Sequence, residues 1–520
     1  HKAPLRFHQM WKTAARSVSS LRSKIATQQS TISWATPRRC LATPHSNLVK
    51  GPTIPLDTIP LATFVQQRGR WQDENDDVAL LCAHSDEKLT FRQLYGRVNA
   101  AARALRDTAN FQKGDVVHLH LHNCVEFVVA FFATLKLGGV VTTSNPAYTA
   151  SELAHTLEDS GATLSLTSRA YQKAVDEAIP LAGGKVKRVW FVEDRDSCFA
   201  CASENYDDDS DMTPSLDPLN DVAVIPYSSG TTGKAKGVCL THHNLTANVQ
   251  QCSDLEAHKI GIHEGDRLVG VLPLFHIYGM TVLMCVALAT RASVVLLPKF
   301  EPEAFLRTLQ DYRVNTAMVA PPLALFMAKH PMVEGYDLTS LRDIFSGAAP
   351  LDASLQAALA ERLNCSVRQG YGMTETSPIV SYCSKGPGSN GGAIGSAGIV
   401  APSTEFIVID GETTQALPLG EEGELCIRGP QVMQGYLNRP DATSESMLAG
   451  GFLRTGDLAR LDDKGTVWIG DRVKELIKVK GFQVAPAELE GLLLEIPEVA
   501  DACVVGVADE RAGEVPKAFV

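Results

Sequence analysis

The sequence predicts an α/β protein in which a large N-terminal domain of stacked α/β sheets, with a β-rich subdomain, precedes a small C-terminal α+β domain. Strand-like and helix-like segments alternate from about residue 61, which is typical of helices that cover largely parallel sheets. Short strand-like segments dominate after Ala401. The chain has 520 residues, 45% of them hydrophobic, and this is enough apolar material for more than one domain.

The individual elements follow from hydrophobic spacing. Residues 94–105 have the spacing of an amphipathic helix, and residues 115–121 alternate as a strand does. Residues 124–137 form a mostly apolar helix that Gly138 and Gly139 end. The other predicted strands are short apolar runs: 163–166, 187–192, 222–227, 293–297 and 315–319 in the large domain, and 405–409, 423–427 and 466–469 in the β-rich part.

Charge and cysteine usage argue against several classes of protein. The net charge of −11 argues against general nucleic-acid binding. No apolar run approaches the roughly 20 residues that cross a bilayer, so we expect no transmembrane segment. The 12 cysteines are scattered and mostly lie in apolar stretches, which favours a reduced protein over a disulfide framework. Cys198 and Cys201 form a CxxC without a second pair, so chance spacing is preferred to a metal or redox site, and the acidic run 204–211 indicates a surface loop.

Residues 1–56 form a basic extension. They hold nine Lys and Arg residues, and no acidic residue occurs before Asp57. An apolar series at helical spacing runs between basic and hydroxyl residues: Phe7, Trp11, Ala14, Val18 and Leu21. This pattern is typical of a mitochondrial transit peptide, so we expect a mitochondrial location, with the peroxisome or cytoplasm as alternatives. A disordered tail or a wrongly assigned gene start is the other interpretation, because the chain opens with His1.

A phosphate-binding loop is predicted after the strand at 222–227, in the run Ser-Ser-Gly-Thr-Thr-Gly-Lys-Ala-Lys-Gly that spans 228–237. Glycines let backbone N–H groups approach a polyanion, the hydroxyls donate hydrogen bonds, and Lys234 and Lys236 supply positive charge. The spacing differs from that of P-loop NTPases. A flexible linker is the alternative, but linkers seldom follow a buried strand and carry paired lysines.

This loop resembles the nucleotide loop of the adenylate-forming superfamily, which contains acyl-CoA synthetases, luciferases and peptide-synthetase adenylation domains. Ala235 stands where the family usually has proline, so the backbone conformation of the loop is less restricted at this position. The resemblance implies that ATP binds to the loop residues: Ser228, Ser229, Gly230, Thr231, Thr232, Gly233 and Lys236.

The run Leu-Pro-Leu-Phe-His-Ile-Tyr-Gly at 272–279 resembles the second motif of the superfamily. A lone histidine in an apolar segment is more often structural, but the resemblance implies that His276 orients the substrate carboxylate and then moves aside for a thiol. Peptide-synthetase domains usually carry an aspartate nearby that holds an amino group. None follows His276, so we expect an acid without an α-ammonium group.

Two further motifs resemble the adenine, metal and ribose sites of the superfamily. In the run from Gln369 through Gly370 to Glu375, a purine can pack on Tyr371, and Thr374 can donate to the α-phosphate. Glu375 can hold Mg²⁺, which prefers a carboxylate together with phosphate oxygens. A glycine-rich turn before a helix is the alternative. Thr-Gly-Asp at 455–457 would place the Asp457 carboxylate on the ribose hydroxyls.

The basic run at 471–483 resembles the hinge and the start of the mobile C-terminal domain of the superfamily. Without the resemblance, such a run would indicate a solvated face. The resemblance implies one role for each of these positions: ribose contact for Arg472, the hinge for Lys474, catalysis at the adenylate or thioester stage for Lys478, and contact with CoA for Lys480, Gly481 and Lys299.

Within the superfamily the chain resembles the branch of 4-coumarate–CoA ligases and fatty-acyl-CoA synthetases. The resemblance implies an acid–CoA ligase that uses ATP, Mg²⁺ and coenzyme A on a small carboxylic acid, either an aromatic propenoic acid such as 4-coumarate or a medium- or long-chain fatty acid. A luciferase-like or carrier-loading enzyme, or an impaired nucleotide-binding homologue, is the alternative. The implied acyl pocket is mostly small and apolar: Tyr278, Val282, Ala317, Gly370, Pro378 and Ile379.

The same resemblance divides the chain into the extension 1–56, an AMP-binding adenylation domain at 57–472 and a partial C-terminal mobile domain at 473–520. The superfamily uses a further lysine near the C-terminus for the first half-reaction, and Lys517 does not have its context. We expect the native protein to continue beyond Val520 rather than to be impaired in adenylation.

Overall fold

The computed structural model describes residues 47–520 apart from short segments and single positions, which are 75, 195–211, 229–234, 254–259, 385–392, 473–476, 480–481, 485, 495, 497–498, 500–501 and 510–512. The predicted transit extension up to residue 46, the pair Cys198 and Cys201, and the acidic run 204–211 therefore lie outside the described residues.

The first sheet of the large domain joins a parallel centre to an antiparallel edge. Its central strands β8, β5, β4, β6 and β7 pair in parallel, and β10 then pairs antiparallel with β8, β9 and β20. In spatial order the strands are β20 (Gly435–Tyr436), β10 (Lys236–Thr241), β8 (Val222–Ile225), β5 (Val140–Thr143), β4 (Val116–His120), β6 (Leu164–Thr167) and β7 (Arg188–Phe191), with β9 (Tyr227–Ser228) beside β10.

The second sheet is also parallel at its centre, from β15 to β2, and antiparallel at both edges. Its strands in spatial order are β17 (Ile399–Val400), β16 (Ile379–Tyr382), β15 (Ser366–Gly372), β14 (Asp343–Ser346), β13 (Thr316–Val319), β11 (Arg267–Gly270), β12 (Ser293–Leu296), β2 (Val78–Cys82) and β3 (Lys88–Thr90).

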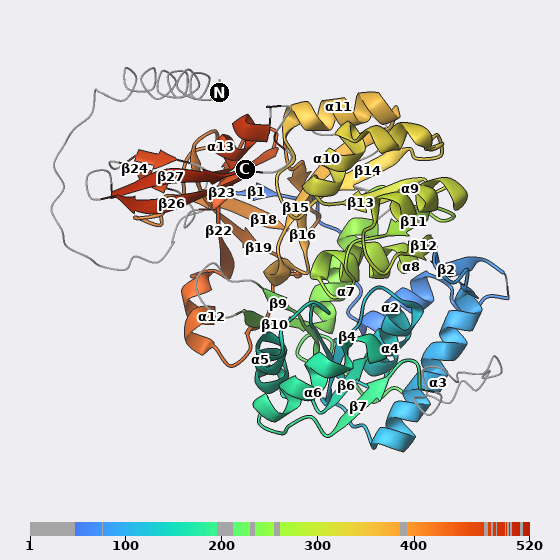
Figure 1. The fold of residues 1–520 in the computed structure, drawn as a ribbon. Coiled ribbons are helices and arrows are strands. Elements are labelled where there is room, and N and C mark those ends of the chain that lie inside the picture. Colours follow the sequence, from blue (N-terminus) through green and yellow to red (C-terminus); the bar gives the residue numbers. More distant parts are fainter. Residues whose placement is uncertain are drawn as a thin grey trace, which may run out of the picture. The chain divides into compact units, whose positions relative to one another are not determined.

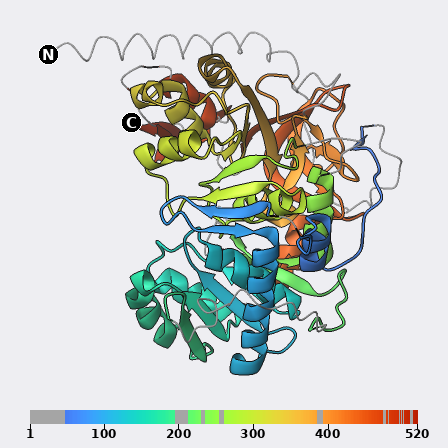
Figure 2. The same cartoon turned by 90° about the vertical axis from the view of Figure 1, so that its right-hand side faces the viewer.

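Helices lie between the two sheets and cover their outer faces (Figures 1 and 2). The middle layer shares one hydrophobic cluster with both sheets: α2 (Leu61–Arg68), α3 (Phe91–Ala109), α4 (Val125–Lys136), α7 (His242–Ser253), η2 (Tyr278–Val286) and α8 (Ala287–Ala289). The first sheet is covered outside by α5 (Ala150–Ser160) and α6 (Gln172–Leu181), with η1 (Arg169–Tyr171) at the start of α6. The second is covered by α9 (Pro302–Asp311), α10 (Pro321–Lys329), η3 (Pro331–Gly335) and α11 (Ala353–Leu363).

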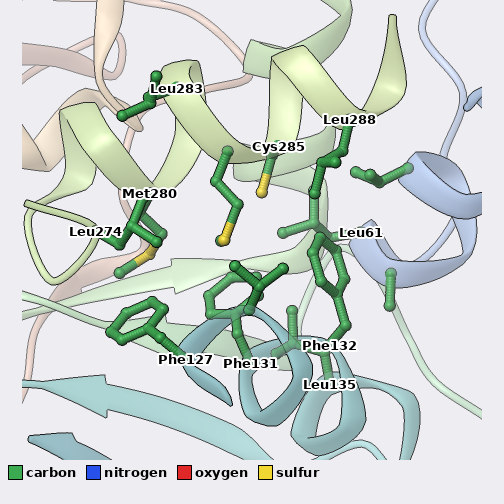
Figure 3. Packing of buried hydrophobic residues seen from close by; sticks show 14 of the residues in the cluster. Leu61, Phe127, Phe131, Phe132, Leu135, Leu274, Met280, Leu283, Cys285 and Leu288 are labelled. Atoms are coloured by element: carbon green, nitrogen blue, oxygen red, sulfur yellow. The ribbon is translucent and has the colours of Figure 1, made fainter. Parts of the chain in front are cut away.

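The core between the sheets is densely aromatic on α4 and aliphatic on η2, a π-helix. The phenyl rings of α4 point across the layer toward Met280 and Cys285 of η2, with Leu274 beside them (Figure 3). Burying each such side chain contributes about 1.5–3 kcal/mol. Because Leu274 and Met280 are both buried, the chain is anchored on either side of His276.

Local sequence sets the ends of several helices. Thr149 accepts a hydrogen bond from the backbone of Glu152 while the Glu152 carboxylate accepts one from the backbone of Thr149, so α5 begins with a capping box. It ends at Gly161, whose φ of 68° is left-handed and suits glycine. Thr90 and Gln93 cap α3 in the same way.

Two smaller sheets are formed mostly by the C-terminal part of the chain, with β1 added from its N-terminal side. The β-rich part contains β1 (Val49–Lys50), β18 (Glu405–Ile409), β19 (Glu422–Arg428), β22 (Phe452–Leu461), β21 (Met447–Leu448) and β23 (Val467–Arg472), all paired antiparallel. The helix α12 (Pro440–Ser446) precedes β21, and η4 (Thr374–Thr376) joins β15 to β16. The last sheet consists of β25 (Phe482–Val484), β24 (Ile477–Val479), β27 (Gly513–Phe519) and β26 (Cys503–Asp509), with α13 (Pro486–Leu494) contacting β26.

The predicted α/β class is confirmed, and the predicted helices 94–105 and 124–137 correspond to α3 and α4. The predicted strand 222–227 differs, because it is divided at Pro226 into β8 and β9. Proline has no N–H to donate to the ladder, although the Pro226 carbonyl accepts from Val238. In the described parts of the chain, no helix has both the length and the apolarity needed to span a bilayer.

Candidate active site

The base of the predicted phosphate loop is a short antiparallel hairpin. Ser228 at the end of β9 lies opposite Lys236 at the start of β10, so the two predicted ligands face each other across the base. The buried strand β8 precedes this hairpin and ties it to the first sheet. The predicted loop ligands between them lie outside the described residues: Ser229, Gly230, Thr231, Thr232 and Gly233.

Helix α5 holds the hairpin base from the side. Nε2 of His155 donates to the Ala235 carbonyl at 2.9 Å, and the Tyr227 hydroxyl donates to Oδ2 of Asp159 at 3.0 Å. Burial and then the Asp159 charge raise the pKa of Tyr227, so the phenol stays a donor. The bond from His155 restrains the backbone at the position where the superfamily usually has proline.

Lys236 and Glu375 meet at Tyr436. Nζ of Lys236 lies 4.4 Å from the centroid of the Tyr436 ring, and the Tyr436 hydroxyl donates to Oε1 of Glu375 at 2.8 Å. Glu375 is only 6% exposed, so this hydrogen bond compensates a buried charge. The structure therefore brings together the predicted phosphate lysine and the predicted metal ligand, through a tyrosine that the motifs did not single out.

The donor set at Glu375 fits magnesium. Within the described residues, no three His, Cys, Asp or Glu side chains gather into a metal-binding cluster. Mg²⁺ is commonly held by one or two carboxylates together with substrate phosphates rather than by an all-protein cage. A single buried carboxylate beside the phosphate hairpin has this chemistry. Thr374, half-buried in η4, directly precedes it.

The predicted ribose site is assembled from three strands. The Tyr371 hydroxyl on β15 donates to Oδ2 of Asp457 on β22 at 2.5 Å, and Nε of Arg472 on β23 lies 3.4 Å from Oδ1 of Asp457. Asp457 and Arg472 are also register partners in the β-rich sheet. Burial first, and then the Asp457 charge, raise the pKa of Tyr371. The predicted adenine platform and the predicted ribose carboxylate are thus neighbours.

Gln369 has a structural role that the motif did not indicate. Its Oε1 accepts from the Leu351 backbone N–H at 2.8 Å, while Nε2 donates to the Leu351 carbonyl and to Oε1 of Gln356, both at 2.9 Å. These bonds hold the amide inside the fold and fix the segment before α11. Its predicted contact with the nucleotide stays a prediction.

His276 is exposed, yet enough protein surrounds its imidazole for desolvation to lower its pKa, so the ring is neutral at pH 7. The segment before it is held from the first sheet. Nδ2 of Asn123 donates to the carbonyls of Gly270 and Leu272 at 2.8 and 2.9 Å, and Oδ1 accepts from the Leu274 N–H at 2.8 Å.

Thr143, at the end of β5, acts on the same segment. Its hydroxyl donates to the Phe275 carbonyl at 2.7 Å, one residue before His276. Asn123 and Thr143 are almost fully buried. Neither belongs to a motif of the superfamily that the sequence displayed, and their only sequence signal is a polar residue at or just after a strand-like run.

The predicted acyl pocket is partly assembled. The Tyr278 hydroxyl donates to the Phe345 carbonyl at 3.1 Å and lies 3.8 Å from Sδ of Met318. Val282 and Ile379 are buried in the cluster that contains Met318 and Phe345, and Pro378 is buried as well. A Cβ on Gly370 would lie 2.5 Å from Cζ of Phe345, so this position requires glycine.

Ala317 is not brought to that wall. It packs in the cluster on the outer face of the second sheet, with side chains of α9 and α10. Neighbouring residues of a strand point to opposite faces, and it is Met318 that reaches Tyr278.

The predicted CoA and C-terminal residues are described only in part. Lys299 is exposed and forms an ion pair with Glu301 at 2.7 Å, and that hydrogen bond raises the pKa of its ammonium group. Lys478 lies on β24, opposite Gln483. The predicted hinge Lys474 and the predicted CoA residues Lys480 and Gly481 lie outside the described residues.

Comparison with known proteins gives matches over most of the chain. Residues 68–437 match the family of AMP-binding enzymes, and residues 488–520 match the AMP-binding enzyme C-terminal domain. The chain is 41% identical over 455 residues to 4-coumarate-CoA ligase 2 of Narcissus pseudonarcissus, which covers 85% of this chain and 79% of the relative.

Solved structures of AMP-forming ligases have the same fold. ATP-bound MatB from Rhodopseudomonas palustris superimposes with a TM-score of 0.77 at 28% identity, covering 88% of both chains. The o-succinylbenzoate CoA synthetase MenE from Bacillus subtilis, in complex with the acyl-adenylate intermediate OSB-AMP, gives a TM-score of 0.73 at 29% identity over 88% of both chains.

Proposed function

The chain belongs to the family of AMP-binding enzymes and is an ATP-dependent acid–CoA ligase, and we propose that its site around Lys236, Glu375 and His276 activates an aromatic propenoic acid as an acyl-adenylate before transfer to CoA. The observation that carries this proposal is the meeting of Lys236 and Glu375 at Tyr436. It joins a cation for the phosphates to a carboxylate for a metal ion.

In the first half-reaction, the carboxylate of the acid attacks the α-phosphorus of ATP, and pyrophosphate leaves. Lys236 stabilises the negative charge that develops on the phosphate oxygens, and Glu375 would hold Mg²⁺, which neutralises phosphate charge when bound. Because the chemistry is mainly positioning and charge stabilisation, residues that fix these two side chains matter as much as the side chains themselves.

In the second half-reaction, the sulfur of CoA attacks the carbonyl carbon of the acyl-adenylate, and AMP leaves. His276 is neutral and solvent-accessible, so its ring N–H can donate a hydrogen bond to the carboxylate of the acid in the first step, and the ring can then turn aside for the thiol. Lys299 offers an exposed cation to the phosphates of CoA. Asp457 and Arg472 retain the ribose of the nucleotide in both steps.

An aromatic propenoic acid suits the pocket better than a flexible chain. The Tyr278 hydroxyl donates to the Phe345 carbonyl at 3.1 Å, which holds the ring at its far end, and Gly347 leaves room for that ring, because a Cβ there would come within 3.1 Å of it. A rigid aromatic wall favours a flat aromatic ligand at 4.5–7 Å ring separation. The relative from Narcissus is named a 4-coumarate-CoA ligase.

The test is acid-dependent exchange of pyrophosphate into ATP by the full-length protein, followed by assay of CoA thioester, with 4-coumarate, cinnamate, octanoate and palmitate. We expect kcat/KM for 4-coumarate to exceed that for octanoate by about tenfold or more. Glu375→Gln should abolish exchange with every acid, whereas Glu334→Gln, an exposed glutamate on η3, should not.

No exchange with any acid would end the ligase assignment, and a preference for octanoate would end the aromatic one. Exchange without CoA thioester, but with light emission or loading of a carrier protein, would indicate the luciferase-like or carrier-loading alternative. Nucleotide binding without exchange would indicate an impaired homologue.

We also propose that residues 1–56 direct the protein to mitochondria, on the basis of their positive charge and helical spacing. The fusion of this segment to a fluorescent protein should enter mitochondria. Replacement of Arg16 and Arg22 by glutamine should prevent entry, and a peroxisomal or cytoplasmic signal from the full-length protein would refute the proposal.

A further inference from the structure

Tyr436 is placed between two charged groups of opposite sign. Its hydroxyl donates to the buried Glu375 carboxylate, and its ring face lies under the Lys236 ammonium group. Among the described residues, the Tyr436 hydroxyl is the one hydrogen-bond partner of the Glu375 side chain. One side chain thus contacts both the predicted metal ligand and the predicted phosphate cation.

The backbone on both sides of Tyr436 is pinned to the strand that begins with Lys236. Tyr436 is the register partner of Val238, the Leu437 N–H donates to the Gly237 carbonyl at 2.8 Å, and the Gln434 N–H donates to the Cys239 carbonyl at 3.0 Å. The Met433 N–H donates to the Glu375 carbonyl at 2.8 Å. The β20 segment is therefore tied to both elements whose side chains it contacts.

We propose that Tyr436 is a positioning residue that fixes the Glu375 carboxylate for the metal ion through its hydroxyl, and the Lys236 ammonium group for the phosphates through its ring. This inference rests on the proposed function, because it assigns the two charges to metal and phosphate. In this proposal, Tyr436 fixes the positions of the Glu375 carboxylate and the Lys236 ammonium group before ATP binds.

The chemistry of the three groups is consistent with this role. An ionised carboxylate has about four lone-pair sites, so a single phenol bond leaves acceptor capacity for a metal ion. A cation within about 6 Å of a ring centroid is attracted by the ring face. Burial and the Glu375 charge both raise the pKa of Tyr436, which keeps the phenol protonated and donating at neutral pH.

Two substitutions separate the two contacts. Tyr436→Phe removes the hydroxyl and keeps the ring, so only the support of Glu375 is lost. Tyr436→Leu removes both. Tyr312→Phe is the matched control, because the Tyr312 hydroxyl also donates to a carboxylate, that of Asp86, but outside the site.

The first measurement is metal affinity without turnover, by electron paramagnetic resonance of Mn²⁺ with ATP and without acid. We expect Tyr436→Phe to weaken Mn²⁺ binding about tenfold, the loss of a hydrogen bond to a charged group. In equilibrium dialysis without metal, Tyr436→Phe should bind ATP as the wild type does, and Tyr436→Leu should bind it about 2–5-fold more weakly, since it loses the cation–π contact. Tyr312→Phe should change neither quantity.

The second measurement is pyrophosphate exchange as a function of free Mg²⁺. Tyr436→Phe should shift the half-saturating Mg²⁺ concentration upward by the same factor and recover most of the wild-type rate at saturation. A merely structural tyrosine would instead lower the rate at every Mg²⁺ concentration. Wild-type Mn²⁺ affinity in Tyr436→Phe would overturn the proposal, whether or not the protein exchanges pyrophosphate with any acid.

If Tyr436→Phe does not fold, 3-fluorotyrosine at position 436 gives the same test with the hydroxyl in place. Its ¹⁹F resonance should shift when Mg²⁺ is added in the presence of ATP, and the same label at position 312 should not. An unchanged resonance at position 436 would refute the positioning role.

Discussion

Replacement of Asn123 by alanine should loosen the segment that carries His276. The substitution removes three hydrogen bonds, from Nδ2 to the carbonyls of Gly270 and Leu272 and from the Leu274 N–H to Oδ1. Each buried backbone group left without a partner costs about 1–3 kcal/mol. The Gly270 carbonyl still accepts from the Leu297 N–H, so two groups, the Leu272 carbonyl and the Leu274 N–H, are left without a partner. They predict a loss of about 2–6 kcal/mol, which is a large fraction of the stability of an ordinary domain.

Hydrogen exchange measured by mass spectrometry separates this local effect from general unfolding. In Asn123→Ala, the peptide covering 270–276 should lose protection, and the exchange of pyrophosphate into ATP should slow because His276 is no longer held in place. Asn244→Ala is the matched control. Asn244 also bridges backbone groups, the Thr241 N–H and the Pro430 carbonyl, but away from His276.

Asn244→Ala should lower the urea midpoint while leaving the protection of 270–276 unchanged. The reasoning is refuted if Asn123→Ala keeps wild-type protection in that peptide, or if its stability falls by less than about 1 kcal/mol, a value below even a single unsatisfied group.

Three further predictions follow from the burial of polar groups and from the close contact at Tyr278. Burial of the ring lowers the pKa of His120 from 6.5 in the unfolded chain to about 4 in the folded protein. As the pH falls, the unfolded chain therefore takes up a proton before the folded protein does. The contribution of His120 to the free energy of unfolding is fully present above pH 6.5 and is lost progressively between pH 6.5 and pH 4. His120→Gln should remove about 2 kcal/mol of the loss between pH 7 and pH 5, measured by urea unfolding; an unchanged pH dependence would contradict this. Arg368→Met leaves the buried Asp343 carboxylate without its guanidinium partner and should cost about 3–5 kcal/mol in urea unfolding, most of it recovered when Asp343→Leu is added, and full stability of the single variant would refute the prediction. Gly347→Ala places a methyl group about 3.1 Å from the Tyr278 ring and should raise KM for an aromatic acid about tenfold with KM for ATP unchanged, whereas an equal rise in both would indicate general misfolding.

The layered fold was largely predictable because periodicity and turn residues act locally. Helix α4 is apolar around its whole circumference, as a helix between two sheets must be, and glycines mark its end. What periodicity could not supply is the face to which each side chain of a buried strand points. On β13, Ala317 and Met318 are both apolar, and only the tertiary arrangement sends Met318 to Tyr278 and Ala317 to the outer face.

The site was predictable where a motif keeps its functional residues close in sequence, as in the hairpin around Lys236 and the turn around Glu375. The residues that connect motifs were not predictable, because their partners are distant in the chain. Tyr436 contacts Glu375 and Lys236, and His155 contacts Ala235, in each case from an element with no motif of its own. The Tyr436 contacts depend on how β10 pairs with β20, and the His155 contact depends on how α5 packs beside the hairpin, neither of which local sequence determines.

Three consecutive residues of β15 each serve a different part of the molecule. Gln369 fastens the segment before α11, Gly370 leaves space for Phe345, and Tyr371 reaches Asp457 on another sheet. Substitutions in β15 are therefore a poor route to a different acid preference, because a change there would disturb nucleotide binding as well. A route to a new acid preference that leaves β15 intact would instead use a residue of another element, such as Val282 of the predicted acyl pocket, which lies on η2.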